Sequence, residues 1–194
     1  MAIASGSRHS MGFITEAAFG VTPNNPTFKA LRHVSTTLGL SKESIQSNEL
    51  RSDRQIADFR HGNKAVSGDI GVELSYGSFD DLLEAVLGGT WAADTPSAGI
   101  AQLKAGVVRR SFSVERHFED ITQYLRFTGV NFSTLSLSVA PNAMVTGTFG
   151  MMGKGMTTSA TALSGSTYPA ATTTSPFDSF TGTINENNSA KVSS

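Results

Sequence analysis

The feature that most constrains the fold is an alternation of apolar and polar residues from Val66 to Tyr76. The apolar members are Val66, Ile70, Val72, Leu74 and Tyr76, and the polar or small ones are Ser67, Asp69, Gly71, Glu73 and Ser75. A period of two places successive side chains on opposite faces of a strand, so one face is buried and the other is polar. Gly68 interrupts the apolar series, which is typical of a β-bulge. The stretch predicts a half-buried β-strand.

A short amphipathic helix is predicted directly after this strand, over Asp80–Leu87. Ser78 is placed to cap the first free backbone N–H groups, and two aspartates begin the helix, where its dipole favours negative charge. Gly88 and Gly89 end it. One apolar stripe runs along the helix: Phe79, Leu82, Leu83, Val86 and Leu87. A helix this short is not stable alone, so we expect it to dock on a sheet or on a neighbouring chain.

Most other segments read as strands. Residues 29–38 predict a partly buried strand with Leu31, Val34 and Leu38 facing inward. Further strands are expected over 107–118, 123–132, 135–139, 144–149 and 180–184. A turn at Pro141-Asn142 joins two of them into a hairpin. The predicted fold class is therefore mainly β, a β-sandwich or half-barrel with one short flanking α-helix.

The chain of 194 residues is long enough for one well-filled core but hardly for two full domains. We divide it into a β domain over 1–156, a linker rich in Ser, Thr and Ala over 157–176, and an extended C-terminal segment over 177–194. The last segment either closes the chain or begins a second β half.

One window of the β domain, residues 41–64, holds much of the charge of the chain. Two interpretations stay open for it. It is either a solvated loop or a long projecting arm that becomes ordered against a neighbouring subunit. The charged residues that would carry the contacts of such an arm are Glu49, Arg51, Asp53, Arg54, Asp58 and Arg60.

Composition argues against several classes of protein. The formal net charge is −1, with 15 basic and 16 acidic residues, whereas strong non-specific DNA binding needs a basic surplus. Charged residues make up only 16% of the chain against about 25% in an average domain, and such a surface favours self-association. There is no cysteine, which excludes disulfides and cysteine-bound zinc. We expect no membrane anchor and no secretory signal, and assembly in the cytosol.

The sequence holds no pattern that points to catalysis. His9, His33, His61 and His117 are isolated, without the spacing of a metal-binding pair. No GxSxG nucleophile elbow is present. Residues 147–155 look faintly like a phosphate loop but lack its first glycine and its last hydroxyl residue. We therefore expect a non-enzymatic protein with no catalytic, cofactor-binding or metal-ligating residues.

The order of these elements resembles a known family. The strand Val66–Tyr76 followed by Phe79–Ala85 is similar to the strand-then-helix core of tail tube proteins from long-tailed bacteriophages. The resemblance continues through residues 113–118, Tyr124, Gly129, Asn131, 135–139 and 146–150. It spans residues 7–156 and rests on pattern and order rather than on a chemical signature.

The resemblance implies a structural subunit, related in fold to the tube protein of type VI secretion, that forms hexameric rings stacked into a hollow tube of the virion tail. It implies that the long early loop, here residues 41–64, reaches the adjacent ring, and that tape measure, terminator and distal tail proteins are partners. DNA would pass through the lumen without specific binding, so Lys and Arg should be scarce there. Candidate lumen residues are Ser136, Ser138, Thr146 and Thr148.

Three alternatives remain open. The first is a tail-completion protein that caps a tube with a single ring, and the second is a tube subunit of a secretion system. The third is a β-sandwich carbohydrate-binding or adhesin module. The third is less favoured because such modules use surface aromatic clusters, whereas this chain has one Trp and three Tyr.

Overall fold

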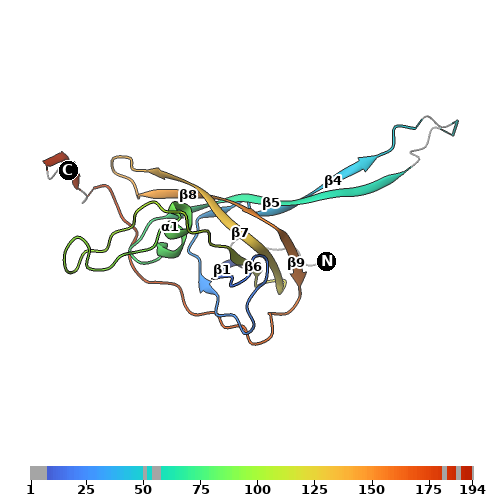
Figure 1. The fold of residues 1–194 in the computed structure, drawn as a ribbon, viewed down its shortest axis with the longest axis horizontal. Helices are drawn as coiled ribbons and strands as arrows, with labels where there is room; N and C mark the ends of the chain where they lie inside the picture. The colour runs from blue at the N-terminus through green and yellow to red at the C-terminus, as the bar shows by residue number, and fades with distance from the viewer. Residues whose placement is uncertain (1–7, 50–51, 54–57, 181–182, 187–188, 194) are drawn as a thin grey trace.

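The computed structural model describes residues 8–49, 52–53, 58–180, 183–186 and 189–193 (Figure 1). Its strands are β1 (His9–Thr15), β2 (Lys29–Ala30), β3 (Ser35–Thr36), β4 (Gly39–Gln46), β5 (Phe59–Glu73), β6 (Phe112–Phe118), β7 (Gln123–Ser138), β8 (Thr146–Gly153), β9 (Gly155–Ser159), β10 (Thr183–Glu186) and β11 (Ser189–Ser193). The helix α1 spans Asp80–Leu87. The predicted mainly β fold with one short flanking helix is confirmed.

Nine of the strands form one open antiparallel sheet in the order β2-β1-β6-β7-β8-β5-β3, with β4 also paired to β5 and β9 also paired to β7. The long strand β7 joins the two halves of this sheet. Its first part pairs with β6 and β9, and its second part pairs with β8. The β7–β8 register shifts between Phe132 and Thr134, as at a β-bulge, which bends a strand and increases its twist.

The core lies between the curved sheet and α1, and aromatic side chains fill it. Phe149 of β8 is fully buried and stacks on Phe79, at 6.1 Å between ring centroids. Phe132 of β7 meets Phe149 edge to face, and Phe112 of β6 meets Phe132 in the same way. Each fully buried side chain of this size contributes about 1.5–3 kcal/mol. Burial of its apolar side, rather than intrinsic propensity, therefore holds the short helix in place.

The predicted bounds of α1 are those observed, but the predicted cap is wrong. Phe79 occupies the N-cap position and no side chain caps the helix. The hydroxyl of Ser78 instead lies in hydrogen-bond distance of Ser75 and of Thr172, because the C-terminal segment crosses this point. Leu82 is fully buried, whereas Leu87, at the end of the predicted stripe, is exposed. Gly88 ends the helix in the left-handed conformation, as expected.

The alternation along β5 is confirmed as far as the strand extends. Val66, Ile70 and Val72 are buried and Leu74 packs partly against the core. The strand ends at Glu73, so the alternation fails beyond it: Tyr76 is 78% exposed, and Ser75 is buried at 5%.

Gly68 does not mark a bulge, because the β5–β8 register runs through it without a shift. Gly68 lies where the chain crosses from β3 to β4 against β5, and its φ is +153°. A Cβ at this position would lie 2.5 Å from the Cα of Leu38. Glycine at position 68 therefore allows the backbone of β5 to approach the backbone of Leu38 closely.

Other expected strands shift at their ends. The strand expected over 29–38 is divided into β2 and β3; Leu31 and Leu38 are buried as predicted, but Val34 is 68% exposed. The strand expected from residue 107 begins only at Phe112, and the two expected over 123–132 and 135–139 are one continuous strand. The hairpin across Pro141-Asn142 is confirmed.

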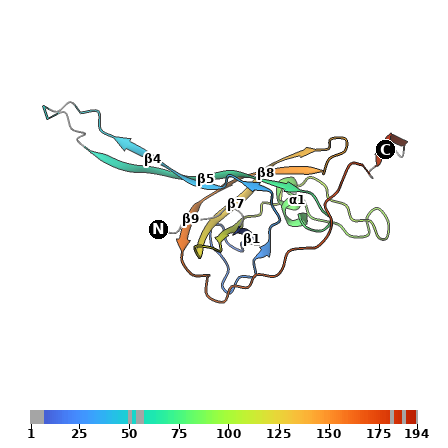
Figure 2. The same ribbon diagram turned by 180° about the vertical axis from the view of Figure 1, so that it is seen from behind.

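The segment after β9 runs along the body of the protein (Figure 2). Thr167 exchanges backbone hydrogen bonds with Pro26 and Phe28, and Phe177 exchanges them with Leu74 and Val145. The boundary expected between residues 156 and 157 falls inside β9. The division into domain, linker and C-terminal segment otherwise stays a prediction. Strands β10 and β11 pair with each other.

Replacing Gly68 by alanine tests the backbone contact. We expect Gly68→Ala to lower the free energy of unfolding by more than about 2 kcal/mol, because the new Cβ would overlap the backbone of Leu38. Gly155→Ala is the matched control, since a Cβ there meets nothing within 4 Å. Urea denaturation of the unassembled subunits measures both. Equal stability of the two variants would contradict the structure.

Candidate functional surfaces

The four hydroxyl residues predicted for a lumen face lie together. Ser136 of β7 is the register partner of Thr148 of β8, and Ser138 is the partner of Thr146. Register partners of an antiparallel pair point to the same side of the sheet. All four residues are exposed. The structure thus brings them onto one solvent-facing surface.

This surface continues across β8 onto β5. Gly71 and Glu73 of β5 are the partners of Thr148 and Thr146, and Asp69 is the partner of Gly150. A Cβ on Gly150 would come within 2.2 Å of the Thr134 hydroxyl and 3.1 Å of an Asp69 oxygen, so these side chains share the surface. We call it the hydroxyl face; its residues are Ser67, Asp69, Gly71, Glu73, Thr134, Ser136, Ser138, Thr146, Thr148, Gly150 and Met152. Met152, the register partner of Ser67, is its one large apolar side chain and is 60% exposed.

The hydroxyl face carries few charged side chains. Among its residues, the only charged ones are Asp69 and Glu73, and none is Lys or Arg. Their strand neighbours on the other side, among them Ile70, Val72 and Phe149, are buried in the core. The surface is thus the solvent side of a sheet packed on one face, as antiparallel sheets often are. Apart from Met152 it offers small hydrogen-bonding groups, and it carries no cationic side chain that would neutralise a phosphate.

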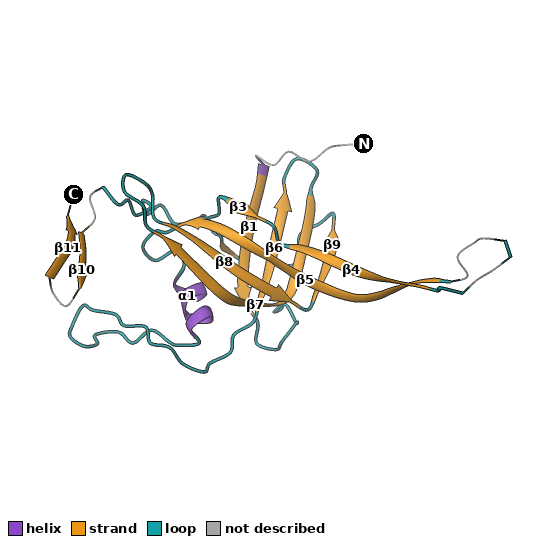
Figure 3. Ribbon diagram, turned by 90° about the horizontal axis from the view of Figure 1, so that it is seen from above, coloured by secondary structure: helices purple, strands orange, loops and turns teal. Residues whose placement is uncertain are grey.

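The second surface is an arm that projects from the body, formed by β4 and the first half of β5 (Figure 3). The pairing runs from Gly39–Ser67 at its root to Gln46–Phe59 near its tip. Beyond the root this ribbon has two strands only, and an isolated two-stranded hairpin is marginally stable in water. It also exposes two large apolar side chains, Ile45 at 62% and Phe59 at 57%. We therefore expect the arm to be fully stable only when another molecule packs against it.

The structure places four of the six predicted arm residues. Glu49, Asp53, Asp58 and Arg60 lie at or near the tip, and Asp58 and Arg60 form an exposed ion pair at 2.6 Å. Exposed pairs of this kind contribute little to stability. Arg51 and Arg54 lie outside the described residues. Sequence reasoning missed that the arm is a ribbon continuous with the core strand, since the alternation is clear only from Val66 onward.

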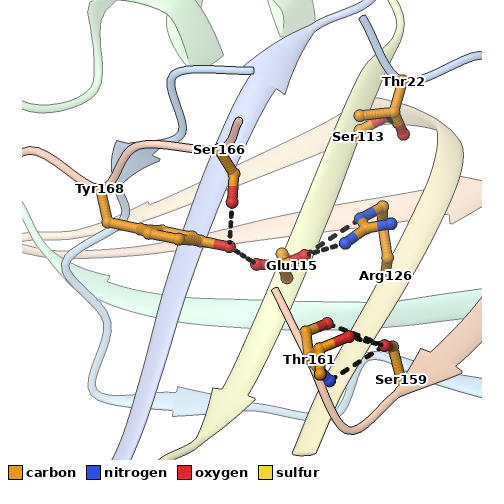
Figure 4. A network of polar contacts seen from close by, with 8 residues as sticks. All are labelled: Thr22, Ser113, Glu115, Arg126, Ser159, Thr161, Ser166 and Tyr168. Atoms are coloured by element: carbon orange, nitrogen blue, oxygen red, sulfur yellow. Dashed lines mark hydrogen bonds and ion pairs between the residues drawn. The ribbon is translucent and has the colours of Figure 1, made fainter. Parts of the chain in front are cut away.

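Sequence reasoning also missed two buried carboxylates. Glu115 is 1% exposed and is bonded by the Arg126 guanidinium at 2.7 Å and by the Tyr168 hydroxyl at 2.6 Å (Figure 4). Burial, and then the bond to Glu115, raise the pKa of Tyr168 to about 12, which keeps its hydroxyl a donor. Glu16 accepts hydrogen bonds from the backbone N–H groups of Gly20 and Gly129 and from the Ser113 hydroxyl.

Both carboxylates are saturated by partners, so they hold the fold together rather than face a substrate. In the part of the chain that the structure describes, no group of three His, Asp or Glu residues could bind a metal ion. No helix among the described residues has the length and apolar character to cross a membrane.

Comparison with known proteins decides the family. A scan of protein families matches residues 6–194 to the phage tail tube proteins. The chain belongs to this family. The protein is thus a structural subunit of a phage tail tube, and the resemblance read from the strand-then-helix order is confirmed. No curated protein sequence matches the chain.

Solved structures share the fold at very low identity. The SPP1 tail tube matches with a TM-score of 0.50 and 12% identity, over 80% of this chain and 78% of that one. The tail of an empty GTA particle matches with a TM-score of 0.50 and 11% identity, over 82% and 100%. The cap that terminates the tube of the anti-feeding prophage matches with a TM-score of 0.50 and 10% identity, over 82% and 92%.

Removing the Tyr168 hydroxyl tests the buried network of the tail tube subunit. We expect Tyr168→Phe to lower the free energy of unfolding by about 1–2 kcal/mol, because a charged, buried acceptor loses one of its donors. Tyr76→Phe, at an exposed side chain, should change it by less than about 0.5 kcal/mol. Urea denaturation of the subunits compares them, and an unchanged Tyr168→Phe would show that the bond is dispensable.

Proposed function

We propose that the subunit closes into hexameric rings that stack into the tail tube, with the hydroxyl face lining the channel through which DNA passes. The hydroxyl face is the observation that carries the proposal. Proteins hold DNA mainly by neutralising phosphates with Lys and Arg, and this face presents neither. Its two carboxylates repel phosphates instead. DNA can slide along such a wall without being retained.

The arm supports the stacking of rings. It projects beyond the body, carries both signs of charge and exposes Ile45 and Phe59. Apolar side chains on a ribbon without a covering layer are stabilised when a second molecule buries them. We infer that the arm of one ring, including Glu49, Arg51, Asp53, Arg54, Asp58 and Arg60, packs on the adjacent ring.

The further partners are tail proteins at the ends of the tube. Tape measure, terminator and distal tail proteins would bind the first and last rings, and the particle would assemble in the host cytoplasm before the tube becomes part of the virion. The similar fold of a tube-terminating cap supports a shared ring architecture. The alternative is a single ring that caps a tube and does not elongate. Electron cryomicroscopy distinguishes such a ring from a tube of stacked rings.

Electron cryomicroscopy of the purified, polymerised protein tests the assembly. We expect hollow tubes of stacked six-fold rings, with Ser136 and Thr148 on the channel wall. A monomer over a wide concentration range would contradict the tube, and a single ring that does not elongate would identify a cap. A hydroxyl face on the outer wall or between subunits would overturn the proposed lining.

The absence of natural cysteine gives a chemical test of the same face. In assembled tubes, we expect Ser136→Cys to react with a small maleimide but not with a maleimide on a bulky polymer, because only the small reagent enters the channel. In unassembled subunits both reagents should react. Protection from both reagents in tubes would place the residue in a subunit interface, and reaction with both would place it outside.

Substitution at the tip tests the arm. We expect the pair Ile45→Ser and Phe59→Ser to shorten the tubes strongly while the subunit keeps its stability, because both side chains are exposed in the single chain. Val107→Ser, at an apolar residue that is 95% exposed and lies outside the arm and its root, is the control. Electron microscopy gives the tube lengths. Tubes of normal length from the double variant would rule out this role of the arm.

A further inference from the structure

A line of hydrogen bonds joins two histidines and an arginine from separate segments. The Nε of Arg116, on β6, lies 3.1 Å from Nε2 of His9, on β1. The Nδ1 of His9 lies 3.1 Å from Nε2 of His33, which stands between β2 and β3. The Nδ1 of His33 lies 3.2 Å from the carbonyl oxygen of Leu31. We call this line the histidine relay.

The chemistry of its members fixes every proton in the relay. The guanidinium of Arg116 can only donate, so Nε2 of His9 must accept. A neutral His9 then carries its proton on Nδ1 and donates it to Nε2 of His33. His33 in turn carries its proton on Nδ1 and donates it to the carbonyl of Leu31. The relay is complete only while both imidazoles are neutral.

The relay ends at the root of the arm. A second nitrogen of Arg116, Nη1, donates to the carbonyl oxygen of Leu38 at 2.6 Å. Leu38 is buried and immediately precedes Gly39, where β4 and hence the arm begin. The relay therefore ties both ends of the segment from Leu31 to Leu38 to strands β1 and β6.

The charged and titratable groups around His9 disfavour a positive charge there. Arg116 faces it from β6 and His33 faces it from the β2–β3 connection, while His117, the register partner of Ser10, acts on it from the other side of the sheet. Burial, followed by the charges of these three residues, lowers the pKa of His9 to about 4. The Tyr124 ring of β7 stacks on His117 at 4.1 Å.

Glu119, which directly follows β6, forms an ion pair with Arg8, at 3.7 Å between Oε2 and Nη2. Phe118 stacks on His9 and adds no charge.

We propose that the histidine relay is a pH-sensitive lock on the root of the arm, closed when both histidines are neutral and opened by proton uptake. A proton added to Nε2 of His33 would face the N–H of His9. A proton added to Nε2 of His9 would face the N–H of Arg116. Either addition replaces a hydrogen bond by two opposed donors, so the relay must separate and free the Leu31–Leu38 segment.

The sign of the pH dependence follows from linkage. A histidine whose pKa is lower in the closed state binds fewer protons there than in the open state. The closed state is therefore fully favoured above the ordinary histidine pKa of about 6.5 and loses its advantage as the pH falls toward about 4. The lock belongs to the single chain and does not depend on tube formation.

Hydrogen exchange of unassembled subunits tests the lock. The amides of Val34 and Thr37 donate to the carbonyls of Gly71 and Asp69 and report on the root segment. After correction for intrinsic exchange rates, we expect their protection to fall about tenfold or more between pH 7 and pH 4.5, in proportion to the linked proton uptake. Unchanged protection would overturn the proposal.

A matched variant separates the lock from general acid sensitivity. In His9→Gln with His33→Gln, each amide side chain can repeat the accept-and-donate order of the relay but cannot take up a proton. We expect this variant to keep its root protection at pH 4.5, while His61→Gln, on the arm surface, behaves like the unsubstituted protein. A double variant with the original pH dependence would refute the lock.

A second measurement needs no substitution. In protein labelled with nitrogen-15 on histidine, we expect His9 at pH 7 to carry its proton on Nδ1 and to remain neutral to about pH 4. An ordinary Nε2–H form of His9, or a titration near pH 6.5, would overturn the proposal even if the double variant failed to fold. Tube formation is measured separately, so failure of the lock leaves the proposed function intact.

Discussion

The burial of Phe149 at the centre of the β5–β8–β7 sheet is the contact on which the rest of the structure depends. Its ring packs against Phe79 from the helix and against Phe132 from β7. Because side chains alternate along a strand, an inward Phe149 fixes an outward Thr148, and the register then fixes an outward Ser136. A slip by one residue would turn hydroxyls into the core and aromatic rings into solvent. The apolar core thus enforces the polarity of the opposite face.

The arm shows how one strand serves two roles. The inner half of β5 packs Val66, Ile70 and Val72 into the core, while its outer half continues into solvent beside β4. Because the strand is continuous, the core sets the direction in which the arm leaves the body. The root is held by two different means, a close backbone contact at Gly68 and the hydrogen bonds of Arg116.

The sequence predicts an element correctly where the spacing of its own apolar and turn residues is enough to determine it. The alternation through Leu74, the bounds of α1 and the β7–β8 hairpin follow from spacing and turn residues. The failures lie where a distant segment intervenes. Ser78 does not cap the helix, because Phe79 occupies the N-cap position and the Ser78 hydroxyl bonds to Ser75 and to the distant Thr172. Gly68 allows the backbone of Leu38 to approach closely and does not form a bulge. Thr172 and Leu38 lie far along the chain from these residues, so no local pattern predicts the two contacts.

The sequence by itself determined the mainly β class, the docked helix, the lack of a basic surplus and the hydroxyl residues Ser136, Ser138, Thr146 and Thr148 as one group. These depend on period and composition, which are local properties. Tertiary structure decided that the acids Asp69 and Glu73 lie beside those hydroxyls, that residues 59–64 extend a core strand and pair with β4, and that His9 contacts His33 and Arg116. These contacts depend on the pairing of strands that are far apart in the chain, and no local sequence pattern specifies which strands pair.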